Sequence, residues 1–262
     1  MLTPIQTGLA IFSGVIVGFS LGLIGGGGSI LAVPLLMYLV GLDRPHLVIG
    51  TTALAVSINA YINLYPHWRA GHIRWKAAIW FAVPGILGDF IGSSLGKLVN
   101  GKDLLFLFAI LMLVVAILML RPRRDNGRGG YEWSRHDFWR VLPAGLAVGF
   151  VSGFFGIGGG FLIVPGLVFS TGMPLIMAIG SSLFSVGTFG LTTAVNYALS
   201  GLVAWLVVVE YVAGGAVGGF LGTHLATRLS GHKRLLNYVF SGIIVVVALY
   251  MMDLNLSALH FR

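Results

Sequence analysis

Residues 18–28 read GFSLGLIGGGG, and residues 149–159 repeat this pattern as GFVSGFFGIGG, at an offset of 131 residues. After one deleted residue the offset becomes 130, and it carries residues 50–92 onto residues 180–222 with their glycines in register. Chance matches between glycine-rich sequences do not keep a nearly constant register over such a length. The two halves of the chain are therefore copies of each other, a common construction in secondary transporters.

The composition is that of a membrane protein. Of the 262 residues, 57% are apolar and 9% are charged, and the mean hydropathy is +0.95. An average soluble domain carries about 25% charged residues, so ordinary soluble enzymes, nucleic-acid-binding proteins and disordered chains are excluded. The basic residues that give the net charge of +8 lie between or at the ends of apolar runs, which is the pattern of topology signals. Because the chain has no cysteine, disulfides and thiolate sites are excluded as well.

Apolar runs recur from end to end and predict an all-α polytopic membrane protein with about ten segments in two repeats of five. The predicted domains are a first transmembrane repeat at 1–121, a cytoplasmic basic linker loop at 122–139 and a second transmembrane repeat at 140–262. The segments lie near 5–24, 29–41, 47–65, 77–98 and 103–121 in the first repeat, and near 141–156, 160–171, 176–198, 204–226 and 233–252 in the second.

The odd number of segments in each repeat predicts that the second repeat enters the membrane upside down. With the linker in the cytoplasm and both termini outside, 12 of the 16 Lys and Arg residues lie on the cytoplasmic side, as the positive-inside rule expects. If the second and seventh segments were re-entrant loops instead, the division would fall to about 10 against 6. The inverted arrangement in a bacterial plasma (inner) membrane is therefore favoured.

The glycine runs that open the second and seventh segments are the first candidate site. A helix of about 12 residues is about 18 Å long, too short for a hydrocarbon core of about 30 Å. We expect the backbone to unwind there, so that N–H groups and the positive ends of two half-helices face an anion. The alternative is that glycine serves only close helix packing. The candidate residues are Gly26, Gly27, Gly28 and Ser29 in the first copy, and Gly158, Gly159 and Gly160 in the second.

Polar residues at helical spacing on the third and eighth segments are the second candidate. Hydroxyl groups near the starts of these helices can join the free backbone N–H groups as donors, and two amides lie further along the same segments. Such a stripe either lines a permeation pathway or forms hydrogen bonds between helices. The candidate residues are Thr51, Thr52, Asn63, Ser181, Ser182 and Asn196.

Asp89 and Glu210 are the acidic residues inside apolar runs. A carboxylate inside the membrane is costly and is by default a functional hypothesis, so both are candidates for coupling transport to protons. They are not repeat partners, because Asp89 aligns with Gly219 and Glu210 with Trp80. This asymmetry suits a coupling role in one copy, but it also suits isolated structural contacts.

Two further patterns are interpreted as structural. Glycines at every fourth position, at 88, 92 and 96 and again at 214, 218 and 222, let helices approach closely. His67 and His72 lie in a basic, aromatic loop without acidic partners nearby, which favours an interfacial anchor over a metal site. No Lys or Arg is expected at depth within an apolar segment, so an anion there has no formal counter-charge.

The paired motifs resemble those of the sulfite exporter TauE/SafE family, whose pattern G-F-x-x-G-x-x-G-x-G-G followed by a proline matches 18–34 and 149–165. Residues 50–52 and 180–182, and then 67–73 and 197–203, also fit the family. The glycine runs of the two copies are not identical, because Ser29 stands opposite Gly160 and Ile157 stands opposite Gly26.

This resemblance implies a carrier that moves sulfite, thiosulfate, sulfoacetate or other sulfur-containing or organic anions across bacterial plasma membranes. The preferred hypothesis is a secondary transporter, and probable export of a small oxyanion is implied only by the resemblance. A passive anion channel of the same fold is the alternative, and a membrane-embedded enzyme is the weakest hypothesis because no catalytic constellation is present. No cofactor and no nucleic acid is expected. The expected partners are the anion, the lipid bilayer and protons, and the formation of a homo-oligomer is left as an open hypothesis.

Overall fold

The computed structural model describes residues 3–120, 135–156, 160–228, 242 and 244–253, and its regular structure over these residues is entirely helical. In the part of the chain that the structure describes, six helices are long and apolar enough to cross a membrane. Three shorter apolar helices, Gly28–Leu39, Gly160–Thr171 and Ile244–Asp253, accompany them. The prediction of an all-α, multi-pass membrane protein is confirmed at this level.

Over the described residues most helices follow the predicted segments, whereas much of the tenth predicted segment, near 233–252, lies outside them. In the first half they are α1 (Pro4–Ile24), the 3₁₀-helix η1 (Gly25–Leu31), α2 (Ala32–Pro34), the π-helix η2 (Leu35–Leu39), α3 (Pro45–Arg69), α4 (Trp75–Gly96) and α5 (Gly101–Leu120). In the second half they are α6 (Arg135–Phe155), α7 (Gly160–Thr171), α8 (Leu175–Ala198) and α9 (Trp205–Arg228). Most of the predicted linker, residues 121–134, lies outside the described residues, and α6 begins at Arg135 rather than near 141.

Local sequence explains where the first helices of the two halves begin and end. Thr3 caps α1 in a capping box with Gln6, and Pro4 occupies the first turn, where its missing N–H costs nothing. The chain leaves α1 at Gly25 with φ of 72° and leaves α6 at Gly156 with φ of 65°. Side chains disfavour this left-handed region, so glycine is required at both repeat-related ends.

The expectation of an unwound glycine loop after α1 was wrong. Gly25–Leu31 forms a 3₁₀-helix that continues through α2 into η2. A 3₁₀ turn keeps backbone groups hydrogen-bonded at a helix terminus, which apolar surroundings favour over an open loop.

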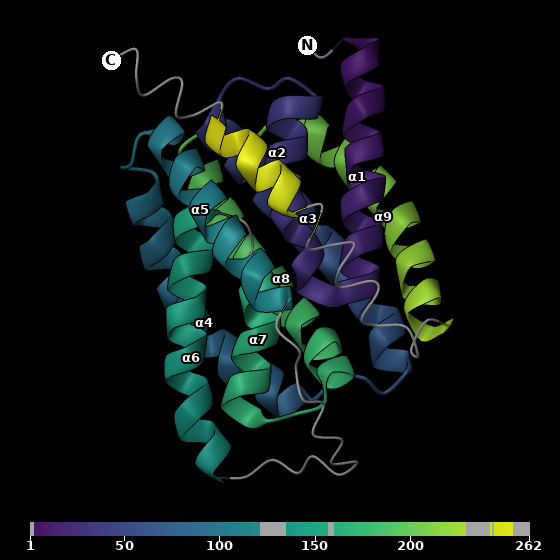
Figure 1. Cartoon of the computed structure of the whole chain (residues 1–262), viewed down its shortest axis with the longest axis vertical. Coiled ribbons are helices and arrows are strands. Elements are labelled where there is room, and N and C mark those ends of the chain that lie inside the picture. The colour runs from purple at the N-terminus through teal and green to yellow at the C-terminus, as the bar shows by residue number, and fades with distance from the viewer. Residues whose placement is uncertain (1–2, 121–134, 157–159, 229–241, 243, 254–262) are drawn as a thin grey trace.

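Helices of one half pack on helices of the other. In Figure 1, α1 runs beside α9 at one flank, α4 and α6 lie together at the opposite flank, and α3 and α8 lie between them. The two flanking pairs correspond under the repeat, because α1 matches α6 and α4 matches α9. Figure 1 also shows α1 beginning at the upper end of the molecule and α6 beginning at the lower end.

Glycine brings the flanking pairs into backbone contact. A Cβ on Gly18 of α1 would collide with the backbone of Gly215, and a Cβ on its repeat partner Gly149 would collide with that of Gly85. The glycines that were predicted to be scaffold meet neighbouring backbone in the same way, at Gly88, Gly92, Gly96, Gly214, Gly218 and Gly222. The structural interpretation of these stripes is confirmed, since such close approach is what small residues permit between membrane helices.

Candidate functional site

The two glycine breaks meet each other inside the protein. A Cβ on Gly26 of η1 would strike the backbone of Gly160 at the start of α7, and a Cβ on Gly160 would strike that of Gly26. Both residues are buried. Gly28 packs against α1, because a Cβ added to Gly28 would lie 2.5 Å from the backbone nitrogen of Leu21. Gly27 lies within η1, whereas Gly158 and Gly159 lie outside the described residues.

Two of the predicted hydroxyl groups lie at this contact. The Ser182 Oγ of α8 accepts a hydrogen bond of 3.4 Å from the Gly26 N–H and donates one of 2.8 Å to the Ile179 carbonyl. The Ser29 Oγ donates to the Gly26 carbonyl at 2.9 Å. Both serines are fully buried. Gly26, Gly160, Ser29 and Ser182 therefore form one cluster, called here the glycine junction.

Thr51 and Ser181 join backbone across the repeats instead. The Thr51 Oγ1 accepts from the Ala204 N–H at 2.9 Å, just before α9, and donates to the Leu47 carbonyl at 2.6 Å. At the repeat-related position, the Ser181 Oγ accepts from the Arg74 N–H at 2.8 Å, just before α4. Thr52 donates to the Val48 carbonyl of its own helix at 2.9 Å. These hydroxyls satisfy backbone groups at helix starts, as the alternative interpretation of the stripe expects.

The two predicted amides lie in different helix interfaces. Asn63 of α3 donates to the Asn59 carbonyl at 2.9 Å and accepts from Thr223 of α9 at 3.3 Å. Asn196 of α8 donates to Ser93 of α4 at 2.7 Å and accepts from the Lys97 Nζ at 2.7 Å. Neither has a recorded contact with the glycine junction, so their role in anion binding stays a prediction.

The two acidic residues differ in their surroundings. Asp89 is fully buried in α4, and its Oδ2 accepts from Thr193 of α8 at 2.8 Å, while its Oδ1 has no hydrogen-bond partner within the described chain. Glu210 is half-buried in α9; its Oε1 accepts from Thr7 of α1 at 3.0 Å, and its Oε2, like the Asp89 Oδ1, has no hydrogen-bond partner within the described chain. Only Asp89 is enclosed by several helices far from any helix end.

Sequence reasoning missed Thr193 and Lys97. Thr193 stands one position away from the polar stripe on its segment, and it faces α4 because of how α4 and α8 pack. Lys97 was expected to mark a segment end, but its Nζ reaches Asn196 and Ser200 across the interface. The available signal was the spacing of Asp89, Ser93 and Lys97, which places them on one face of a helix.

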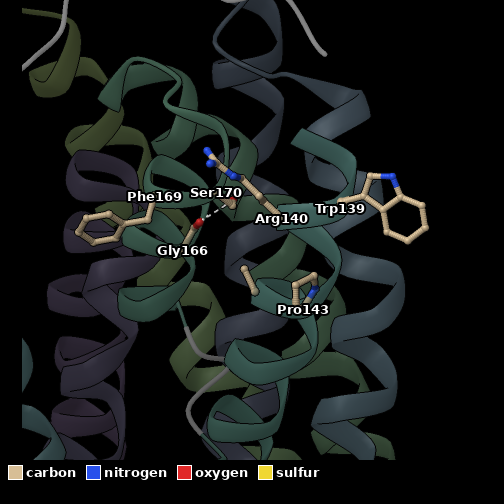
Figure 2. Close-up of a pocket in the computed structure, with 7 residues that line it drawn as sticks. Trp139, Arg140, Pro143, Gly166, Phe169 and Ser170 are labelled. Atoms are coloured by element: carbon tan, nitrogen blue, oxygen red, sulfur yellow. Dashed lines mark hydrogen bonds between the residues drawn. The ribbon is translucent and has the colours of Figure 1, made fainter. Parts of the chain in front are cut away.

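A surface groove between α6 and α7 contains none of the predicted site residues. It is lined by Trp139, Arg140, Pro143, Ala144, Gly166, Phe169 and Ser170. In Figure 2 the Arg140 side chain extends toward Ser170, whose hydroxyl donates to the Gly166 carbonyl at 2.6 Å, and the Trp139 ring points away from them. Over the described residues, no three His, Asp or Glu side chains gather as metal ligands.

The chain is similar to known membrane proteins over nearly its whole length. The sequence model of the sulfite exporter TauE/SafE family matches residues 10–251. A probable membrane transporter protein of Xylella fastidiosa is 54% identical over 92% of this chain and 93% of its own length. The probable membrane transporter protein YunE of Bacillus subtilis is 28% identical over 82% of this chain and 87% of its own. No solved structure matches the chain.

The names of these relatives indicate a membrane transporter rather than an enzyme. A probable membrane transporter protein of Haemophilus influenzae, 31% identical over 74% of both chains, agrees with them. The match to the family covers both glycine breaks, five of the six candidate membrane spans of the described residues in full, and the first span from residue 10 onward. This multi-pass membrane transporter belongs to the sulfite exporter TauE/SafE family.

Proposed function

We propose that the protein is a secondary transporter that exports a small sulfur-containing or organic anion, such as sulfite, across the bacterial plasma membrane. The observation that carries this proposal is the contact between Gly26 and Gly160. It brings the short helices of both repeats to one buried point, which is where many transporters of repeated architecture hold their substrate.

The anion is proposed to bind by displacing the weak hydrogen bond at the junction. The Gly26 N–H to Ser182 Oγ distance of 3.4 Å is long for a hydrogen bond. An oxyanion is a stronger acceptor and forms shorter bonds with backbone N–H and hydroxyl donors. Glycine permits this approach because it has no Cβ between the backbone and the ligand. Several modest contacts, without a Lys or Arg at the junction, favour release as well as binding.

The proposed topology is ten crossings with both termini outside, in two inverted repeats of five. Two observations support it. In each repeat the first helix packs on the fourth helix of the other repeat, as α1 packs on α9 and α6 on α4, and α1 and α6 begin at opposite ends of the molecule (Figure 1). Single cysteines at Arg69, the exposed last residue of α3, and at Ser200, in the exposed turn after α8, are expected to react with a membrane-impermeant maleimide from opposite sides. Labelling of both from the same side would contradict the inverted arrangement.

The site is tested by sulfite flux in liposomes that contain the purified protein. Gly26→Ala and Gly160→Ala are expected to lower the flux strongly, because each added Cβ meets backbone of the other break. Gly8→Ala is the matched control, since a Cβ there meets nothing within 4 Å. Ser182→Ala removes one donor without adding volume and is expected to weaken sulfite binding in a folded protein.

Three outcomes distinguish the hypotheses. Normal flux in both glycine variants would contradict the placement of the site. Flux of other anions but not sulfite, over a panel of sulfur oxyanions and carboxylates, would change the substrate. Flux that no ion gradient accelerates would favour a passive anion channel of the same fold over a secondary transporter.

A further inference from the structure

Polar side chains line the α4–α8 interface from Asp89 to the end of α4, in two hydrogen-bonded groups. Asp89, Ser93 and Lys97 follow one another at intervals of four residues on one face of the helix. On α8, Thr193 bonds to Asp89, Asn196 bonds to Ser93 and Lys97, and Ser200 accepts from Lys97 at 3.1 Å. This row, called here the α4–α8 ladder, is polar from the end of the helix to a fully buried carboxyl group.

We propose that Asp89 is the proton-binding group of the transporter and that the α4–α8 ladder is its path to the membrane face where α4 ends. This inference rests on the proposed transport function and deepens it. In the proposed topology α4 ends outside, so protons reach Asp89 from outside while the anion leaves the cell. The proton binds the carboxylate without any other bond being made or broken, and it departs from the same oxygen.

The unpaired atoms around Asp89 fit a group that gains and loses a proton. The Asp89 Oδ1 and the Ser152 Oγ of α6 are both buried without a hydrogen-bond partner among the described residues. Ser152 interacts with the carboxyl group, and its hydroxyl can donate to the ionised carboxylate or accept from a protonated Oδ1. A buried carboxylate is costly, and proton binding relieves that cost.

The charged and titratable groups near Asp89 are few. Tyr197 of α8 faces the carboxyl group, and its hydroxyl is another buried atom with no partner in the described structure. Lys97 lies at the outer end, with its Nζ 5.8 Å from the Tyr197 ring centre. The side of α6 that packs against Asp89 contributes Ser152 and the backbone of Gly153.

Lys97 places a fixed positive charge at the outer end of the ladder. Its ammonium group is fixed by hydrogen bonds to the Asn196 carbonyl, the Asn196 side chain and Ser200. A fixed positive charge repels any cation on the same path, a proton as well as a sodium ion, so the charge alone does not select between them. A proton needs only one carboxylate oxygen as its final ligand, whereas a metal cation needs several oxygen ligands, and the proposed path requires a proton to cross from the Ser93–Asn196 group to the Asp89–Thr193 pair.

The other repeat has no equivalent path. Gly219 stands at the position of Asp89, Leu21 at that of Ser152 and Thr227 at that of Lys97. Glu210 does not replace Asp89 either, because it is half-buried and bonded to Thr7 near the start of α9. Among the residues that the structure describes, Asp89 is therefore the acidic residue that is fully buried, and the ladder is its proposed access.

The test compares sulfite movement with and without a pH gradient in liposomes. Asp89→Asn is expected to keep sulfite exchange at equal pH and to lose the acceleration by a pH gradient. Thr193→Val, which removes the hydrogen bond to the carboxylate, is expected to weaken that acceleration without abolishing it. Glu210→Gln is the matched control, a second intramembrane acid changed to its amide, and is expected to respond to the gradient as the unchanged protein does.

A spectroscopic measurement tests the same inference without transport. The infrared carboxyl band of the unchanged protein is expected to contain a pH-dependent component that Asp89→Asn removes and Glu210→Gln retains. Normal acceleration in Asp89→Asn, a carboxyl component that does not change with pH, or acceleration by a sodium gradient alone would each overturn the proton assignment. Absence of sulfite exchange in the unchanged protein would instead contradict the proposed function, and the infrared titration would still decide the role of Asp89.

Discussion

The α1–α9 and α6–α4 interfaces share a backbone plan and differ in their side chains. Gly14 and Gly22 of α1 approach α9 as Gly145 and Gly153 of α6 approach α4. Between these contacts the partners diverge. The lesson is that backbone contact fixes the glycines in both copies, while the side-chain positions between them are free to acquire different chemistry.

Three repeat-related positions show this divergence. Asp89 with Thr193 on one side corresponds to Gly219 with Asn63 on the other. Phe189 packs on Gly85, and at the corresponding place Asn59 packs on Gly215. Trp80 packs edge-to-face with Phe138 at 4.8 Å, where the other interface has the hydrogen bond from Thr7 to Glu210. These corresponding pairs can be perturbed in parallel, and each parallel change tests the comparison.

The largest effects are expected where the two interfaces agree. Gly18→Leu and Gly149→Leu are each expected to lower the free energy of unfolding by about 3 kcal/mol or more, since overpacking alone costs about 1–3 kcal/mol and here backbone must separate. The measurement is the thermal midpoint of the purified protein in detergent. Gly8→Leu is the control, because that position is open. A large loss in one variant and none in the other would break the proposed equivalence of the interfaces.

The sequence predicted this shared plan well. The repeated glycines gave the helix ends at Gly25 and Gly156 and the close contacts of α1 and α6, because each of these depends on local backbone geometry. The length of α7 also follows from the run of apolar residues between two glycines. Periodicity and small-residue spacing carry information of this local kind.

The candidate site could be predicted only in part. Ser29 and Ser182 were expected near the glycine runs and lie at the junction. Thr51 was expected among the same donors, but it bonds to the Ala204 N–H of the other repeat. Its partner depends on how two distant helices pack, which spacing along one helix does not contain. Thr193 was missed for the same reason.

An intermediate effect is expected at Asn59. Its side-chain nitrogen and oxygen are both buried without hydrogen-bond partners in the part of the chain described, and each such group costs about 1–3 kcal/mol. Asn59→Leu, which makes the position apolar like its counterpart Phe189, is expected to raise the free energy of unfolding by about 1 kcal/mol. The measurement is the shift of the thermal midpoint in detergent.

Asn63→Leu is the matched variant one helical turn away. Asn63 has hydrogen bonds to the Asn59 carbonyl and to Thr223, so the same substitution is expected to destabilise by about 1 kcal/mol. Changes of opposite sign in the free energy of unfolding would show that the two asparagines differ because only the Asn63 side chain has hydrogen-bond partners within the described residues. A loss of stability in Asn59→Leu would show that the asparagine amide has a stabilising role that the apolar counterpart does not share.

The smallest effects are expected at the outer ends of the interfaces. Trp80→Leu removes an edge-to-face pair with Phe138, and such pairs contribute about 0.5–1.5 kcal/mol beyond area burial. Glu210→Gln at the corresponding position keeps an amide oxygen that can still accept from Thr7, so the free energy of unfolding is expected to change by about 0.5 kcal/mol or less. Thermal midpoints of the two variants in the same detergent measure both changes. If Glu210→Gln destabilises the protein more than Trp80→Leu, the Glu210 carboxylate stabilises the fold more than its half-buried position explains. The two positions would then not be equivalent packing positions.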